Sequence, residues 1–137
     1  MKNRSYESFL TREDRLQIAV INYIKLAYPL IVPVHVPNEG KRTLYEQWKL
    51  KQMGLTAGVP DILIFFQRPK SEGSNVILSG LAIELKVKYD NGKKNVPTPK
   101  QKRFLQLLHD NGWYTAVIYT IEDAKKVIDK YLKLKDL

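Results

Sequence analysis

The spacing of apolar and polar positions along the chain alternates between a helical period and a strand period. An apolar face that runs from Leu16 to Ala27 has the helical period, and Thr11 followed by Asp14 is typical of a helix cap. Thr98 with Pro99 and Gln101, and Thr120 with Asp123, are similar helix starts. The pattern therefore predicts helices over about 12–28, 98–111 and 120–134, and a shorter one over 44–53.

Apolar runs predict four strands, over 31–36, 61–66, 80–88 and 114–119. A proline within 31–36 favours an edge strand, whereas 61–66 is apolar on both faces and is typical of a central strand. The polar segments 67–79 and 90–97 are predicted as loops, 37–42 as a turn, and the first ten residues as a loose tail. The expected fold class is α/β, with the order α-β-(α)-β-β-α-β-α and a mixed sheet flanked by helices.

The composition narrows the kind of protein this is. The chain has 137 residues, of which 44% are hydrophobic, and this suits one globular domain over 1–137. It has no cysteine, which excludes disulfides and thiolate sites and agrees with a reducing cytosol. No leader pattern and no membrane-length apolar run is present, so we expect a cytoplasmic protein without a membrane partner.

The chain is strongly basic, because it has 23 Lys and Arg residues but 14 Asp and Glu residues, which gives a formal net charge of +9. Such an excess favours a polyanionic partner, most often nucleic acid. The basic residues cluster in two segments, next to a turn with Asn38 and Gly40 that could approach a phosphate. For each one alone, a solvated side chain is the better explanation. Trp48, Trp113 and the tyrosines are expected in the core and not as base-stacking platforms. The candidate DNA contacts are Asn38, Gly40, Lys41, Arg42, Lys49, Lys51, Lys88, Lys93, Lys94, Lys100, Lys102 and Arg103.

Two carboxylates and a lysine carry the candidate chemistry. Asp61 stands directly before the most apolar run, and Glu84 and Lys86 share one face of 80–88, about 7 Å apart by strand geometry. If the two strands pair, the three side chains converge, and two close carboxylates require a proton or a cation between them. Mg²⁺ prefers such oxygen ligands, which predicts metal-assisted phosphodiester hydrolysis. The alternative is a salt bridge at a sheet edge without a metal.

The motifs resemble those of the PD-(D/E)XK nuclease superfamily, and in finer detail those of its VRR-NUC branch (virus-type replication-repair nucleases). "PD" at 60–61 and "ELK" at 84–86 match the signature, and further matching pieces are Glu13 in "EDRLQ", "PNEGKR", "KQMGLTAGVPDI" and "TPKQ" with Gln101. The resemblance spans about residues 11–132. It implies a restriction-endonuclease-like core for the mixed sheet.

The resemblance also implies roles for individual residues. Asp61, Glu84 and the main-chain carbonyl of Leu85 would bind the metal, and Lys86 would activate the water. Gln101 would line the site, although it could instead only complete the cap with Thr98. Glu13 would reach the site through water or a second metal. Two alternatives to Glu13 stay open, an ordinary solvated first-turn acid and Glu7 as the true partner.

The expected function is a Mg²⁺-dependent endonuclease that selects branched DNA by shape, since no base-reading helix is recognisable. Mn²⁺ is expected to substitute for Mg²⁺. Small members of the branch resemble junction-resolving enzymes, which implies a homodimer that cuts a four-way (Holliday) junction symmetrically, and a phage or mobile-element origin. The alternatives are a flap or single-strand nuclease of replication or repair, and a nucleic-acid-binding scaffold without turnover. His35 and His109 lack ligand spacing and are not expected to bind metal.

Overall fold

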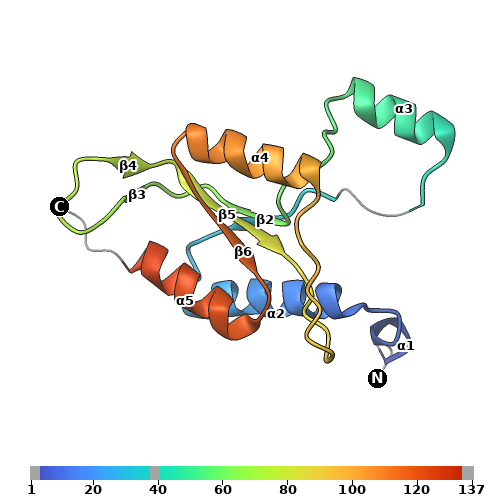
Figure 1. Ribbon diagram of the computed structural model, residues 1–137, viewed down its shortest axis with the longest axis horizontal. Coiled ribbons are helices and arrows are strands. Elements are labelled where there is room, and N and C mark those ends of the chain that lie inside the picture. Colours follow the sequence, from blue (N-terminus) through green and yellow to red (C-terminus); the bar gives the residue numbers. More distant parts are fainter. Residues whose placement is uncertain (1–3, 38–40, 134–137) are drawn as a thin grey trace.

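A four-stranded mixed sheet with helices on both faces forms the body of the molecule (Figure 1). The computed structural model describes residues 4–37 and 41–133. The helices are α1 (Arg4–Glu7), α2 (Arg12–Ala27), α3 (Leu44–Gln52), α4 (Pro99–Asp110) and α5 (Ile121–Leu132), and the strands are β1 (Pro33–Val34), β2 (Ile62–Ile64), β3 (Arg68–Pro69), β4 (Ile77–Leu78), β5 (Gly80–Leu85) and β6 (Trp113–Ile118). Helix α4 lies on one side of the sheet, and α2 and α5 lie on the other.

The sheet has the order β1-β2-β5-β6. β2 pairs antiparallel with both β1 and β5, whereas β5 pairs parallel with β6. Helix α4 forms the crossover that connects β5 to β6 along the chain. The prediction of an edge strand around Pro33 and of a central strand after Asp61 is therefore confirmed. The predicted mixed α/β class is confirmed too, while the full element order also contains α1, within the segment predicted as a loose tail, and the β3–β4 pair.

Threonine caps determine where three of the long elements begin. The hydroxyl oxygens of Thr11, Thr98 and Thr120 accept hydrogen bonds from the main-chain N–H groups of Asp14, Gln101 and Asp123. Each of these bonds satisfies an N–H group that the first helical turn leaves without a partner. The helix starts predicted from these threonines are confirmed to within one residue.

The core lies between the sheet and the pair α2 and α5. Leu81, Ile83 and Leu85 of β5 pack there with Ile24 of α2 and Ile128 of α5, and all five are fully buried. Burial of a side chain of this size contributes about 1.5–3 kcal/mol to folding. Because side chains alternate along β5, the residues between them face the opposite side of the sheet, where α4 lies.

Two predictions about polar and apolar segments are wrong. The segment 67–79, predicted as a loop, contains the β3–β4 hairpin, in which Arg68 is opposite Leu78 and both side chains are buried. The strand predicted over 61–66 ends at Ile64, and the side chains of Phe65 and Phe66 are exposed. Phe65 instead packs edge-on against Trp113. Local hydrophobicity does not reveal that the chain turns away from the sheet at this point.

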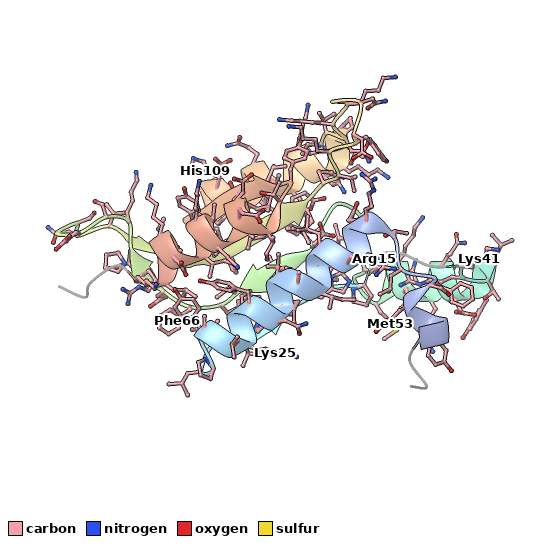
Figure 2. The ribbon with its side chains drawn as sticks, turned by 90° about the horizontal axis from the view of Figure 1, so that it is seen from below. Arg15, Lys25, Lys41, Met53, Phe66 and His109 are labelled. Carbon is pink, nitrogen blue, oxygen red and sulfur yellow. The ribbon has the colours of Figure 1, made fainter. Side chains whose placement is uncertain are left out.

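Helix α3 stands apart from the body of the molecule (Figure 1) and buries none of its residues. The prediction that Trp48 belongs to the core is therefore wrong, since 59% of this residue is exposed. Figure 2 shows Lys41, which precedes α3, at the opposite end of the molecule from Phe66. Among the described helices, none is both long and apolar enough to cross a lipid bilayer.

Candidate functional site

The pairing of β2 with β5 brings the two predicted carboxylates together. Ile62 is opposite Ile83 in an antiparallel register, so Asp61, one residue earlier, falls beside Glu84. The Leu85 N–H donates a hydrogen bond of 2.7 Å to Oδ2 of Asp61. Nζ of Lys86 lies 3.6 Å from Oε1 of Glu84. The predicted convergence of Asp61, Glu84 and Lys86 is thus present in the structure.

Glu84 is buried in a way that disfavours its own charge. Only 1% of the residue is exposed, and its Oε2 has no hydrogen-bond partner within the described part of the chain. Burial, and then the nearby charge of Asp61, raise the pKa of Glu84 to about 8, although Lys86 acts in the opposite direction. A buried carboxylate with an unsatisfied oxygen and a second carboxylate beside it is an environment that a divalent cation would relieve.

The donor set fits a hard cation that keeps several of its own waters. Across residues 4–37 and 41–133, no three His, Asp or Glu side chains are grouped as metal ligands. The protein ligands would be the carboxylates of Asp61 and Glu84 with the main-chain carbonyl of Leu85. Mg²⁺ is commonly held by one or two carboxylates together with water and phosphate oxygens, so this set suits it.

Glu13 lies in the first turn of α2. It is half-buried, and its charge is among the causes that raise the pKa of Glu84. It lines a pocket of about 570 Å³ together with Val87 and Tyr89, which follow β5. Glu7, the alternative acid, is exposed on α1. The neighbouring Asp14 forms the helix cap with Thr11 and lines the same pocket.

Gln101 both caps α4 and lies at the site. Its Oε1 accepts a hydrogen bond of 2.8 Å from the Thr98 N–H, so the capping box is present. It also lines a pocket of about 210 Å³ together with Asp61 and Gly58. Gly58 allows this approach, because it has a φ of +90° and a Cβ there would lie 2.6 Å from the carbonyl oxygen of Lys100. The two interpretations of Gln101 are therefore compatible in space.

Sequence reasoning missed His35. Its Nδ1 lies 2.7 Å from the main-chain oxygen of Asp61, and the ring lines the same pocket as Asp61 and Gln101. His35 has no ligand spacing to any other residue, so no local motif marked it. The antiparallel pairing of β1 with β2 brings it there, and only a predicted strand pairing could have identified it.

The basic residues lie around the end of the sheet toward which β5 runs (Figure 1). One group is on or just before α3, a second follows β5, and a third is in the first turn of α4 and just beyond it. All of them are exposed except Arg42, which is half-buried, while Asn38 and Gly40 lie outside the described residues. The exposed members are Lys41, Lys49, Lys51, Lys88, Lys93, Lys94, Lys100, Lys102 and Arg103. Contacts with DNA remain a prediction for each.

Known proteins that are similar to this chain are found by comparison of structures. No family model and no curated protein matches the chain. Among solved structures, a "VRR_NUC domain protein" is similar at 29% sequence identity and a TM-score of 0.69, with 93% of each chain covered. A "VRR_NUC domain" at 21% identity has a TM-score of 0.53, covers 89% of this chain and 99% of its own, and supports the fold alone. The recognition of a VRR-NUC domain from the sequence motifs is thereby confirmed.

Proposed function

We propose that this protein is a Mg²⁺-dependent, structure-selective endodeoxyribonuclease of the PD-(D/E)XK type that hydrolyses phosphodiester bonds in branched DNA. The observation that carries the proposal is the meeting of Asp61, Glu84 and Lys86 on two adjacent strands, at a buried position, in a fold shared with VRR_NUC domain proteins. A structural salt bridge alone would not require the second carboxylate beside Glu84, which makes the site electrostatically unfavourable without a cation.

The residues of the site have separable tasks. Asp61, Glu84 and the carbonyl of Leu85 hold the ion, which when bound supplies positive charge at the scissile phosphate and acidifies water. The Lys86 ammonium, kept near Glu84, orients the attacking water and opposes the negative charge that develops on the phosphate. Glu13 would reach the same site indirectly, through a water molecule or a second ion. Gln101 holds water in the pocket that it shares with Asp61.

Asp61 is held at both its side chain and its main chain. The Leu85 N–H donates to its side chain, and the His35 ring contacts its main-chain oxygen. Such supporting contacts keep ligand oxygens in place before an ion arrives, which lowers the reorganisation that binding requires. Nearby basic side chains then attract the DNA backbone to the same end of the molecule.

The proposal includes a homodimer that resolves four-way junctions. Two copies of the site related by a two-fold axis would cut two strands symmetrically, which is the geometry that a junction presents. Sedimentation equilibrium of the free protein measures the mass directly. A protein that remains monomeric at micromolar concentration, free and bound to a junction, would contradict this part of the proposal.

One assay tests the activity and its substrate. Labelled linear duplex, flap and four-way junction are incubated with the protein in Mg²⁺, Mn²⁺ or EDTA, with Asp61→Asn as the matched control that keeps the shape of the side chain. We expect metal-dependent, symmetrically paired cuts in the junction and no cut by the control. Preferential cleavage of the flap would assign the alternative nuclease task. Absence of metal-dependent cleavage on every substrate would leave a binding scaffold.

A further inference from the structure

Helix α3 exposes a set of large apolar side chains that a folded monomer rarely leaves in water. Leu44 is 85% exposed, Tyr45 65% and Trp48 59%, and Met53, which caps the end of the helix, is 71% exposed. The helix is capped by Thr43 but has only nine residues and buries none of them. Helices shorter than about 12–15 residues are marginal in water without tertiary packing. The exposed rings of Tyr45 and Trp48 therefore indicate a partner surface.

The charge around α3 favours a polyanion as that partner. Lys41, Arg42, Lys49 and Lys51 lie on or next to the helix, and Glu46 is the one acid within 41–53. Two copies of this face brought together would place like charges side by side, which opposes self-association. Nucleic acid supplies both the negative charge and flat apolar surfaces.

The two rings of α3 are arranged as a pair. Tyr45 and Trp48 are three residues apart on one side of the helix, with ring centroids 6.3 Å apart and planes inclined by 32°. Exposed aromatic rings beside lysines are the arrangement on which unpaired bases stack, because every base has a π-face. A fully paired duplex hides these faces inside its own stack.

The helix is attached close to the candidate site. The segment that follows it, 53–60, leads directly into Asp61, and within that segment Gly58 packs against the main chain of Lys100 at the start of α4. Figure 1 shows α3 beyond the end of α4 that begins at Pro99. A strand held on α3 would thus be near the pocket formed by Asp61 and Gln101.

We infer that α3 binds unpaired DNA bases, with Tyr45 and Trp48 as stacking platforms and the neighbouring lysines on the phosphates. The inference rests on the proposed nuclease function and deepens it, because it assigns recognition of a branch to bases that are not in a duplex. Under this inference, α3 is the structural element by which the protein selects DNA by shape.

Fluorescence of Trp48 tests the stacking directly. The chain has two tryptophans, so Trp113→Phe leaves Trp48 as the one fluorophore of its kind and retains a ring against Phe65. In EDTA, we expect a short oligothymidylate to quench this fluorescence and an abasic strand of the same length to leave it unchanged. Equal quenching by both strands, or by neither, would overturn the inference. Since no cleavage is measured, the result does not depend on whether the protein is a nuclease.

Substitutions separate stacking from general burial of apolar surface. Trp48→Leu should weaken binding of oligothymidylate by roughly 5- to 100-fold, whereas Trp48→Phe should keep most of the affinity. Leu44→Ala is the matched control, because it removes a more exposed apolar side chain from the same helix. We expect it to leave the affinity unchanged. Thermal unfolding should be the same for all three, since α3 buries no residue.

Sedimentation of the same variants tests whether α3 instead binds a second copy of the chain. If α3 were a contact between two copies of the chain, Trp48→Leu and Leu44→Ala would both lower the mass of the free protein. That outcome would assign the face to a second copy and overturn the inference. An unchanged mass together with base-dependent quenching would support it.

Discussion

Glu84 is a carboxylate at a position where an ionised group costs free energy. It lies on the buried strand β5, its Oε2 has no hydrogen-bond partner in the described residues, and the charge of Asp61 is close by. Lys86 offsets part of this cost. A residue in such an unfavourable environment is a candidate for chemistry, because a structural role could be filled by an apolar side chain.

Removal of either carboxylate should separate cleavage from binding. We expect Asp61→Ala and Glu84→Ala to lower the cleavage rate by about a thousandfold or more, since each removes a ligand for the ion. Binding of junction DNA should be kept or strengthened, because a negative charge near the phosphates is lost. Single-turnover cleavage and a gel-shift titration measure the two quantities. An equal loss of both would count against the metal role.

The raised pKa of Glu84 predicts how the metal-free protein responds to pH. The pKa rises from 4.5 to about 8, so between these values the folded state keeps a proton that the unfolded state releases. In EDTA, the contribution of Glu84 to the free energy of unfolding should therefore be highest below pH 4.5. This contribution should fall as the pH rises to about 8, by at most about 1.4 kcal/mol per pH unit.

Urea unfolding at pH 6 and pH 8 checks this dependence. Glu84→Gln should remove it, because an amide does not titrate. Added Mg²⁺ should raise the melting temperature of the wild-type protein more at pH 8 than at pH 6, since the ion competes with the proton. If the pH profiles of wild type and Glu84→Gln coincide, Glu84 does not titrate in this range.

The loop before β2 and the start of α4 form one unit of the site. Gly58 packs its α-carbon against the main chain of Lys100, and this contact brings Gln101 toward Asp61. A helix start is rigid because its cap holds it, and Thr98 forms that cap. Distances between the loop and the helix therefore set the dimensions of the pocket.

Gly58→Ala should disturb this unit through a clash and not only through backbone strain. A Cβ would lie 2.6 Å from the Lys100 oxygen, at a φ of +90°. Gly54→Ala is the matched control, since Gly54 has a φ of +101° but no atom within 4 Å of the added carbon. We expect both variants to lose about 1 kcal/mol from strain, and Gly58→Ala to lose more stability and to cleave more slowly. Urea unfolding and cleavage rates measure the difference, and equal losses would exclude the clash.

On the scale of the molecule, the positive charge is distributed unevenly around the sheet. The basic groups on α3, after β5 and in α4 gather near the end toward which β5 runs (Figure 1). Charges gathered in this way attract a polyanion over a longer distance than scattered charges do, and they release counterions when it binds. The candidate site lies at the same end.

Binding of DNA should accordingly weaken steeply with salt. The logarithm of the association constant should fall linearly with the logarithm of the salt concentration, by about 0.9 per phosphate contact. Lys100→Ala should make this slope shallower by about one contact. Lys126→Ala, an exposed lysine on α5 across the sheet from α4, is the control and should leave the slope unchanged. Fluorescence anisotropy at several salt concentrations measures it, and a flat response would exclude the basic surface as the binding site.

Features that depend on neighbouring residues could be predicted from the sequence. The helix starts at Thr11, Thr98 and Thr120, the alternation of side chains along β5 and the resemblance to VRR-NUC domains all follow from short motifs. Caps and alternation act within about four residues, so the chain beside them decides the outcome. The convergence of Asp61 with Glu84 needed one further assumption, the pairing of their strands.

The sequence by itself determined the α/β class, the caps and the residue types of the site, because these rest on local geometry and side-chain chemistry. Only the tertiary structure decided that Trp48 is exposed, that His35 supports Asp61, and that Gln101 can cap a helix and line the pocket at once. The physical reason is that burial and contact depend on segments far apart in the chain. Local patterns carry no information about which of those segments will meet.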